Sequence, residues 1–402
     1  MEGNNMEYIK NFEKLGFGVF VHFGLYSIEQ KGEWYKGVYG ISDEKYMQLK
    51  DKFKVKKHWA KELVAVAKKA GAKYINLVTR HHDGFSLFDT CGLNDYDAPH
   101  SACGRDLVKE FVDECNKQGI VPFLYHTLLD WYNKDFNDDF PKYLEYLRKS
   151  VEILCTKYGK IGGFWFDGQW AKPDEDWEED ALYGLIRKYQ PEAIIINNTG
   201  LSERGKTGHK EIDCVTFERG KPVFVDRSEK PIAGEMCQIL NDHWGNALND
   251  FNYKSVGSLI EDLVDCRVAG CNFILNLGVL KDGSLNPIEA GYFNEIGKWI
   301  RYNKNFIYEA KPVEGVGADD AQILYDGNYY YALIKNVTMT ADPNVAINSE
   351  LGEIKINTDK KVTQAMWLDN GKRVKAKKNV VRIEPFFYGN SGVVRVLRFN
   401  LI

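Results

Sequence analysis

Residues 121–168, VPFLYHTLLDWYNKDFNDDFPKYLEYLRKSVEILCTKYGKIGGFWFDG, contain two short apolar runs on either side of a stretch with helical periodicity. The runs at 121–127 and 163–168 have the length and the aromatic and β-branched content of buried strands. Between them, Pro141 suits the first turn of a helix, and apolar residues recur every three or four positions as far as Gly159. A strand, a helix and a second strand in this order predict a βαβ unit with parallel strands.

The same alternation extends over residues 17–300. Two further helices are predicted, one from Trp59 to a stop at Gly71 and one from Leu107 to a stop at Gly119. Eight segments are expected to form strands: 18–24, 74–79, 121–127, 163–168, 193–198, 214–218, 236–240 and 272–278. This pattern predicts an α/β fold, a (β/α)8-like (TIM-type) barrel. An open doubly wound sheet is the main alternative, but it requires a glycine-rich turn after the first strand, where residues 25–28 (LYSI) stand.

The character of the sequence changes after Tyr302. Helical periodicity gives way to alternating β segments such as 321–336 (AQILYDGNYYYALIKN), with turn signals at 326–327 (DG) and 370–371 (NG). We therefore expect a barrel domain over residues 1–310 and a small C-terminal β-sandwich domain over residues 311–402.

The composition of the chain argues against some classes of binding partner. The chain has 53 Lys and Arg against 57 Asp and Glu, a formal net charge of -4, which lacks the basic footprint of nucleic-acid binding. No apolar run approaches the ~18 residues of a membrane helix. The eight cysteines form no CxxC pair, and the N-terminal residues contain no apolar stretch of a secretory signal. We expect a cytoplasmic protein with no nucleic-acid or membrane partner. The sequence leaves open whether the chain forms a homo-oligomer.

Functional residues of a (β/α)8 barrel lie at the C-terminal ends of its strands. Four histidines and two carboxylates fall at such positions: His22, His81, His82, His126, Asp167 and Glu218. A single histidine at a strand end is usually structural, whereas four on one rim indicate a functional site.

Two chemistries suit this rim. In metal-assisted hydrolysis, the histidines and Asp167 would hold zinc or a metal pair. In glycoside hydrolysis, one carboxylate attacks the sugar, a second protonates the leaving oxygen, and the histidines bind hydroxyls. The metal interpretation expects HxH or HExxH spacing, which the chain lacks, and adjacent His81 and His82 would point to opposite faces of a strand unless a bulge intervened. Asp167 is the best candidate nucleophile, while local sequence does not order Glu218 and Glu235.

Several blocks occur in a fixed order between residues 8 and 310: FGVFVHFGLYS (17–27), GEWY (32–35), AKYINLVTRHHDGFSLFDT (72–90), WFDG (165–168), GEMCQILNDHWG (234–245) and GCNFILNLGVLKDG (270–283). Together they resemble the α-L-fucosidases of glycoside hydrolase family 29. The resemblance implies a (β/α)8-like barrel with a C-terminal β-sandwich. It also implies a retaining exo-glycosidase for terminal α-linked L-fucose of oligosaccharides or glycoconjugates, with no metal and no other cofactor.

The resemblance implies residue roles as well. Asp167 matches the nucleophile, and Glu218 matches the segment that usually carries the acid/base, with Glu235 as the runner-up. The residues expected to bind substrate are His22, Glu33, Trp34, His81, His82, Tyr125, His126 and Trp165. Phe23 is expected to join Trp34 and Trp165 in an apolar wall for the C5 methyl group. The chain departs from the family at Thr199, where an arginine is frequent, and Arg204 is the expected substitute. A carbohydrate-binding protein without catalysis and a metal-dependent barrel hydrolase are the alternatives.

Overall fold

The structure is a computed structural model that describes residues 7–198, 208–223, 225–340 and 352–402. It contains two compact units, one made of Met1–Lys254 and Asn272–Asn294, the other of Ser255–Cys271 and Glu295–Ile402. The expected boundary between residues 310 and 311 stays a prediction. Within the described ranges, every helix is too short or too polar to cross a membrane.

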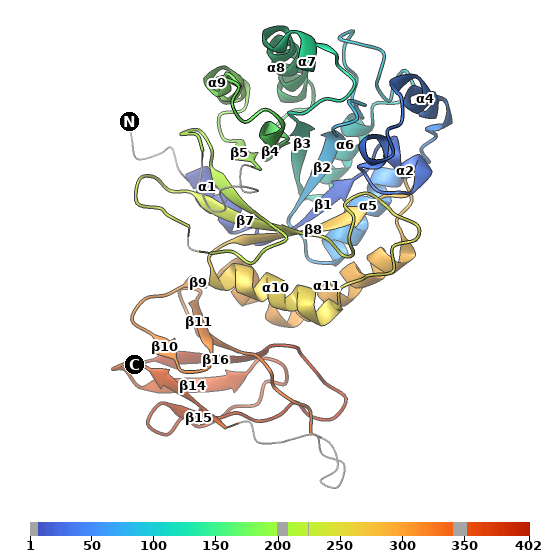
Figure 1. Ribbon diagram of the computed structural model, residues 1–402. Helices are drawn as coiled ribbons and strands as arrows, with labels where there is room; N and C mark the ends of the chain where they lie inside the picture. The colour runs from blue at the N-terminus through green and yellow to red at the C-terminus, as the bar shows by residue number, and fades with distance from the viewer. Residues whose placement is uncertain (1–6, 199–207, 224, 341–351) are drawn as a thin grey trace. The chain divides into compact units, whose positions relative to one another are not determined.

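The first unit is a closed barrel of eight parallel strands that pair in chain order (Figure 1). The strands are β1 (Phe17–His22), β2 (Tyr74–Arg80), β3 (Val121–Thr127), β4 (Gly163–Asp167), β5 (Ile194–Asn197), β6 (Cys214–Glu218), β7 (Ala233–Gln238) and β8 (Asn272–Gly278). This architecture confirms the predicted barrel. The largest difference is in β7, which begins three residues before the expected position 236 and ends two residues before position 240.

Helices and helical turns connect the strands of the barrel. They are α1 (Glu7–Glu13), α2 (Tyr26–Glu29), α3 (Tyr35–Val38), α4 (Asp43–Met47), the 3-10 helix η1 (Gln48–Lys52), α5 (Trp59–Lys69), α6 (Leu107–Gln118), α7 (Asp135–Asp138), α8 (Phe140–Lys157), the 3-10 helix η2 (Gln169–Ala171) and α9 (Glu179–Tyr189). The three helices predicted from periodicity are α5, α6 and α8. Asp106 caps α6 by accepting from the Lys109 amide at 2.9 Å, and Gly119 ends it with a φ of 73°.

Side chains two residues apart on each strand point into the barrel and fill it. The interior cluster includes Phe20, Tyr74, Phe123 and Trp165 together with aliphatic residues of β5 to β8. At the N-terminal ends of the strands, the Phe12 ring of α1 lies 5.5 Å from the ring of Tyr74 and 5.4 Å from that of Phe123. Helix α1 and these rings occupy the base of the barrel, and the pocket lined by the ends of the strands opens at the opposite rim.

The second unit contains two antiparallel sheets, in the orders β10-β13-β15 and β14-β16-β12-β11-β9. Its strands are β9 (Lys311–Pro312), β10 (Gly317–Ala318), β11 (Gln322–Tyr325), β12 (Tyr330–Ile334), β13 (Glu353–Asn357), β14 (Val362–Trp367), β15 (Val380–Arg382) and β16 (Arg395–Leu401). Helix α10 (Val256–Val268) belongs to this unit, and α11 (Pro287–Tyr308) begins in the first unit and ends in the second. The expected sandwich is confirmed, with the β11–β12 hairpin turning at Asp326 and Gly327.

Candidate active site

A pocket opens at the C-terminal ends of the barrel strands. The space between its side chains amounts to about 450 Å³, open solvent at the mouth included. Its lining consists of aromatic rings, histidines and two carboxylates: Phe20, His22, Trp34, His81, His82, Tyr125, Trp165, Asp167, Trp170, Asn198, Glu218 and Trp244. The structure therefore brings together eight of the residues expected from the sequence.

Asp167, the last residue of β4, is the most heavily hydrogen-bonded group of the pocket. Its Oδ1 accepts from Trp170 Nε1 and from Asn198 Nδ2, both at 3.2 Å. Its Oδ2 accepts from the Tyr125 hydroxyl at 3.2 Å and lies 3.4 Å from His82 Nε2. These contacts fix the position of the carboxylate and stabilise its ionised form.

Glu218, the last residue of β6, faces Asp167 across the pocket. The same Asn198 Nδ2 that contacts Asp167 lies 2.8 Å from Glu218 Oε2. On the other side, Arg219 Nε lies 3.5 Å from Glu218 Oε1. Glu218 thus has fewer hydrogen-bond donors than Asp167.

The environments push the pKa values of the two carboxyls in opposite directions. Burial alone would raise the pKa of Asp167, but the contacts from His82, Trp170 and Asn198 outweigh it and lower that pKa. The pKa of Glu218 is raised, chiefly by burial and further by the charge of Asp167, with Asn198 opposing. One carboxylate is therefore held ionised while the other is biased towards its protonated form, the division of roles that acid–base chemistry requires.

His22 and His81 are neutral hydrogen-bonding groups of the pocket. Burial lowers the pKa of His22 to about 3 and that of His81 well below its usual value. His22 Nδ1 lies 2.6 Å from Asn276 Oδ1, and Asn276 Nδ2 donates to the Trp244 carbonyl at 2.6 Å. Because an amide oxygen can only accept, His22 carries its proton on Nδ1 and leaves Nε2 as an acceptor for a hydroxyl.

A bulge in β2 explains why both adjacent histidines reach the pocket. The register against β3 shifts between Val78 and Arg80, and Thr79 Oγ1 donates to the Tyr125 carbonyl at 2.7 Å. Beyond this shift the strand alternation no longer applies, and the rings of His81 and His82 lie 4.2 Å apart. The bulge is the condition under which both histidines were expected to share a face.

Buried aspartates hold the loops that carry these histidines. Asp83 accepts from the Tyr46 hydroxyl at 2.8 Å, and burial raises its pKa to about 6. Asp130 Oδ1 accepts from the amides of Tyr132 and Asn133 at 2.8 and 2.9 Å. Both carboxylates therefore act as loop caps.

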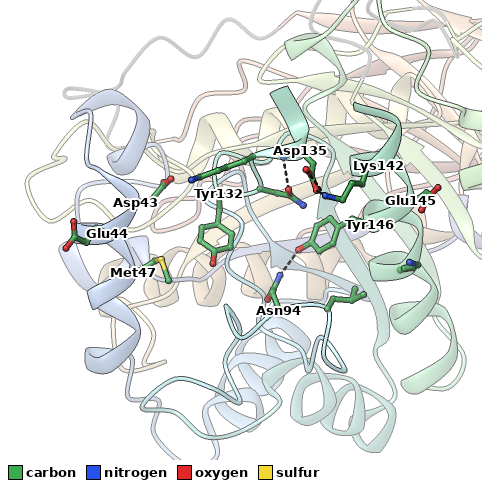
Figure 2. A pocket seen from close by; sticks show the side chains of 13 residues that line it. Asp43, Glu44, Met47, Asn94, Tyr132, Asp135, Lys142, Glu145 and Tyr146 are labelled. Carbon is green, nitrogen blue, oxygen red and sulfur yellow. Dashed lines mark hydrogen bonds and ion pairs between the residues drawn. The ribbon is translucent and has the colours of Figure 1, made fainter. Parts of the chain in front are cut away.

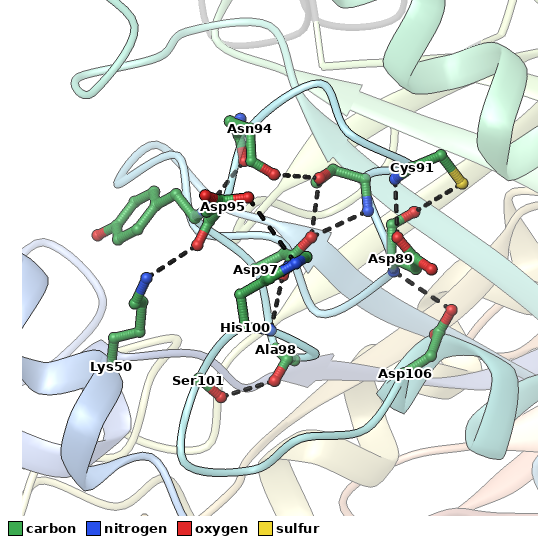
Figure 3. Close-up of polar contacts among 12 residues, drawn as sticks. Lys50, Asp89, Cys91, Asn94, Asp95, Asp97, Ala98, His100, Ser101 and Asp106 are labelled. Atoms are coloured by element: carbon green, nitrogen blue, oxygen red, sulfur yellow. Dashed lines mark hydrogen bonds and ion pairs between the residues drawn. The ribbon is translucent and has the colours of Figure 1, made fainter.

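The loop between β2 and α6 is fixed in the same way (Figure 3). Asp89 Oδ1 accepts from the Cys91 amide at 2.8 Å, and Asp97 Oδ2 accepts from the Thr90 hydroxyl at 2.8 Å. Asp97 Oδ1 accepts from His100 Nδ1 at 2.7 Å. These acidic residues are engaged by their own loop and stabilise its path.

Three residues expected to contact the sugar lie outside the pocket lining. His126 points away from the barrel interior, where Nε2 contacts Ser150 Oγ at 2.8 Å, because its neighbour Tyr125 takes the inward position on β3. Glu33 Oε2 accepts from the amides of Trp244 and Gly245 at 3.1 and 2.7 Å, so Glu33 supports the loop that carries Trp244.

Phe23 is the third. Its ring packs 5.4 Å from both Phe53 and Trp59, because it follows inward-pointing His22 and faces outwards. Phe20, two residues before His22, lines the pocket instead.

Glu235 lies below the pocket. Since Thr216 pairs with Glu235 and Glu218 pairs with Cys237, Glu235 sits two residues, about 6–7 Å, deeper than Glu218. It accepts from the Tyr74 hydroxyl at 2.5 Å and from Trp165 Nε1 at 3.1 Å. This placement follows from the register of β7 against β6, which puts Glu235 in the middle of its strand and Glu218 at the end of its own.

Sequence reasoning missed Phe20, Trp170, Asn198 and Trp244. Strand alternation could have found Phe20 and Asn198, because each lies two residues from another inward position on its strand. Trp170 lies in the three-residue 3-10 helix η2 and Trp244 in a loop, and neither segment is long enough or regular enough to show a periodicity. Thr199 and Arg204 lie outside the described residues.

A larger cavity lies elsewhere in the first unit, about 1510 Å³ by the same measure (Figure 2). Asp43 and Glu44 of α4 stand on one side of it and Lys142 and Glu145 of α8 on the other, with Tyr132 between them. It contains neither Asp167 nor Glu218, and its lysine and carboxylate side chains are of mixed sign. We therefore assign the chemistry to the smaller pocket, where the two carboxylates converge.

Within the described part of the chain, no group of three or more His, Cys, Asp or Glu side chains is placed to hold a metal ion. A barrel rim with paired carboxylates, hydrogen-bonding histidines and aromatic walls defines a glycoside hydrolase.

Comparison with known proteins identifies the family. The chain belongs to the alpha-L-fucosidase family, whose model matches residues 2–305. It is 27% identical to the tissue alpha-L-fucosidase of Mus musculus over 340 residues, which cover 75% of this chain and 71% of the mouse protein. It is 25% identical to the alpha-L-fucosidase of Dictyostelium discoideum, with the same shares of each chain covered.

Solved structures agree with this assignment. Alpha-L-fucosidase isoenzyme 1 from Paenibacillus thiaminolyticus matches with a TM-score of 0.81 and 26% identity, covering 99% of each chain. A family 29 fucosidase from Bacteroides thetaiotaomicron, trapped as a covalent intermediate, shares the fold with a TM-score of 0.83 and 23% identity, covering 98% of this chain and 96% of its own.

Proposed function

We propose that this protein is a retaining exo-α-L-fucosidase that removes terminal α-linked L-fucose from oligosaccharides or glycoconjugates by double displacement. Glu218 gives its proton to the leaving oxygen while an oxygen of Asp167 bonds to C1. Glu218 then takes a proton from water, the water oxygen bonds to C1, and Asp167 leaves as a carboxylate. Each step inverts C1, so the product keeps the configuration of the substrate.

The short separation of the two carboxylates carries this proposal. One amide nitrogen lies 3.2 Å from Asp167 Oδ1 and 2.8 Å from Glu218 Oε2, so these oxygens are no further apart than the sum of the two distances. That sum is below the ~6.5 Å at which the separations of inverting enzymes begin, because those enzymes need room for a water molecule. The spacing favours direct attack by Asp167.

The rest of the pocket suits a 6-deoxy sugar. Neutral His22 and His81 can bond hydroxyls without burying a charge, and Phe20 and Trp165, with rings 5.1 Å apart, offer an apolar surface for the C5 methyl group. Aromatic residues close the barrel below, which favours a terminal sugar over an internal one.

Stereochemistry tests the mechanism directly. Proton NMR of an aryl α-L-fucoside digest should show the α anomer of fucose first, with the β anomer appearing only as the sugar equilibrates. First appearance of the β anomer would refute retention.

The nucleophile is tested by Asp167→Ala. This variant should lose turnover of activated and natural fucosides alike, because the covalent ester cannot form. Azide should restore reaction of the activated substrate and give a fucosyl azide of inverted configuration. Near wild-type activity would remove Asp167 from the role.

Glu218→Ala and Glu235→Ala form a matched pair for the proton donor. Loss of the general acid should lower the cleavage rate ~10²- to 10⁴-fold for a substrate whose leaving group is a sugar. The rate for a dinitrophenyl fucoside should fall much less, because dinitrophenolate leaves without being protonated. Glu218→Ala should show this split together with a lowered KM, and azide should give a product of retained configuration. If Glu235→Ala alone showed this difference between the two substrates, Glu235 and not Glu218 would be the proton donor.

Fucosyl linkage is tested separately. Oligosaccharides with α-1,2, α-1,3, α-1,4 and α-1,6 fucose, compared with the aryl fucoside, would rank the natural substrates.

A further inference from the structure

Asn198 occupies the space between the two carboxylates. Its side chain is 3% exposed, and its Nδ2 lies within 3.2 Å of an oxygen of both Asp167 and Glu218. A primary amide nitrogen carries two hydrogens, so it can serve both carboxylates at once. No other described side chain donates to both.

The orientation of this amide is fixed from β6. Thr216 Oγ1 donates to Asn198 Oδ1 at 3.0 Å, and the Asn198 main-chain amide donates to the Phe166 carbonyl at 2.8 Å. A flipped amide would turn its oxygen towards two carboxylates and lose the bond from Thr216. The side chain therefore has one favourable orientation, with its nitrogen towards the carboxylates.

We propose that Asn198 is a positioning residue that couples Asp167 and Glu218 into one acid–base unit, with Thr216 setting the orientation of its amide. This inference rests on the function proposed above. When Asp167 becomes an ester it loses its charge, and the amide then bonds mainly to Glu218. In that half of the reaction Glu218 must be a carboxylate to take the proton from water, so the bond is strengthened when it is needed.

The coupling has a measurable signature in the pH profile. The acid limb of kcat/KM reports ionisation of the nucleophile, and the basic limb reports loss of the proton from the acid. Asn198→Ala removes a donor from both carboxylates, so both pKa values rise and both limbs move to higher pH, by about 0.5–1 unit. A residue that only fills space would lower the profile without moving its limbs.

Other ionisable groups surround the pair and stay in place in the variant. They are His22, Glu33, His82, Tyr125, Arg219 and Cys237. A common shift of both limbs therefore points to the amide.

Two further variants separate this role from a general effect on folding. Thr216→Val keeps the shape of the side chain but frees the Asn198 amide to rotate, so both limbs should move in the same direction by less. Asn197→Ala is the matched control, because Asn197 donates to Gln169 and Tyr183 and contacts neither carboxylate. It should leave both limbs where they are in the wild type.

The experiment is the pH dependence of kcat/KM for an aryl α-L-fucoside across the full-length wild type and three variants. In parallel, ¹³C NMR titration of the Asp167 and Glu218 carboxyl carbons measures the same shifts without turnover. Upward shifts of both groups in Asn198→Ala and Thr216→Val, but not in Asn197→Ala, support the coupling. Unmoved limbs and unmoved carboxyl titrations overturn it. A wild type that does not cleave the fucoside refutes the proposed function, while the titration still decides the coupling.

Discussion

Glu235 offers a test of the electrostatics inside the barrel. Its carboxyl is buried beneath Trp165, and burial raises its pKa to about 7, against the hydrogen bonds from Tyr74 and Trp165. We expect Glu235→Gln to stabilise the protein at neutral and alkaline pH. The glutamine oxygen can accept from Trp165 Nε1 and its amide nitrogen can donate to the Tyr74 hydroxyl, as a protonated glutamate would, and glutamine has no proton to lose.

The magnitude follows from linkage. In the unfolded chain the carboxyl has a pKa of about 4.3, so between pH ~4 and ~7 the folded state holds a proton that the unfolded state releases. Stability of the wild type therefore falls as pH rises through this window, by up to about 1.4 kcal/mol per pH unit. Over the whole window this single carboxyl costs about 4 kcal/mol.

Urea unfolding across this pH range is the assay. The difference in unfolding free energy between Glu235→Gln and wild type should be near zero at the acid end and reach about 4 kcal/mol at the alkaline end. Glu192→Gln is the control, since this surface glutamate pairs with Lys160 and should show no comparable gain at high pH. A difference that does not change with pH would refute the reasoning, and so would a gain of equal size in the control.

Three further outcomes are expected. Trp170→Phe removes the indole donor from Asp167 alone, so the acid limb of the pH profile should move up by about half a unit while the basic limb stays; movement of both limbs would contradict this. His126→Ala should cost about 1–3 kcal/mol of stability, because Ser150 loses its partner, yet leave KM for the fucoside within about threefold; a large rise in KM would return His126 to the sugar site. Incubation with a chelator followed by desalting should leave kcat/KM unchanged, because no three or more His, Cys, Asp or Glu side chains of the described residues are placed to hold a metal ion, and activity restored only by added metal would count against this.

The strands were predictable because each buried strand of a parallel barrel is an apolar run bounded by turn residues. Three of the eight, β3, β6 and β8, have the expected bounds. β7 differed because Ala233 and Gly234 are weak strand formers, and they join the sheet through pairing with Cys214 and Val215. That pairing is a tertiary effect that local sequence does not contain.

The candidate site was partly predictable for the same reason. Residues at strand ends, such as Asp167, Glu218 and His22, reach the rim by topology alone. Whether a neighbouring side chain points inwards depends on register, which separates Tyr125 from His126, and on the bulge after Val78, which brings His81 and His82 together. The positions of Trp170 and Trp244, which lie outside the strands, depend on contacts between segments distant in sequence.

Because side chains fill the base of the barrel, the pocket is closed at its inner end. A glycan cannot thread through it, so a fucose unit enters and leaves by the same mouth. Each turnover then ends with full release of the trimmed glycan, and the enzyme cannot advance along a chain. The rate on a complex glycan should depend on how many fucosylated tips it presents, not on its length. Branched glycans should lose their tips in separate encounters, in an order set by how accessible each tip is.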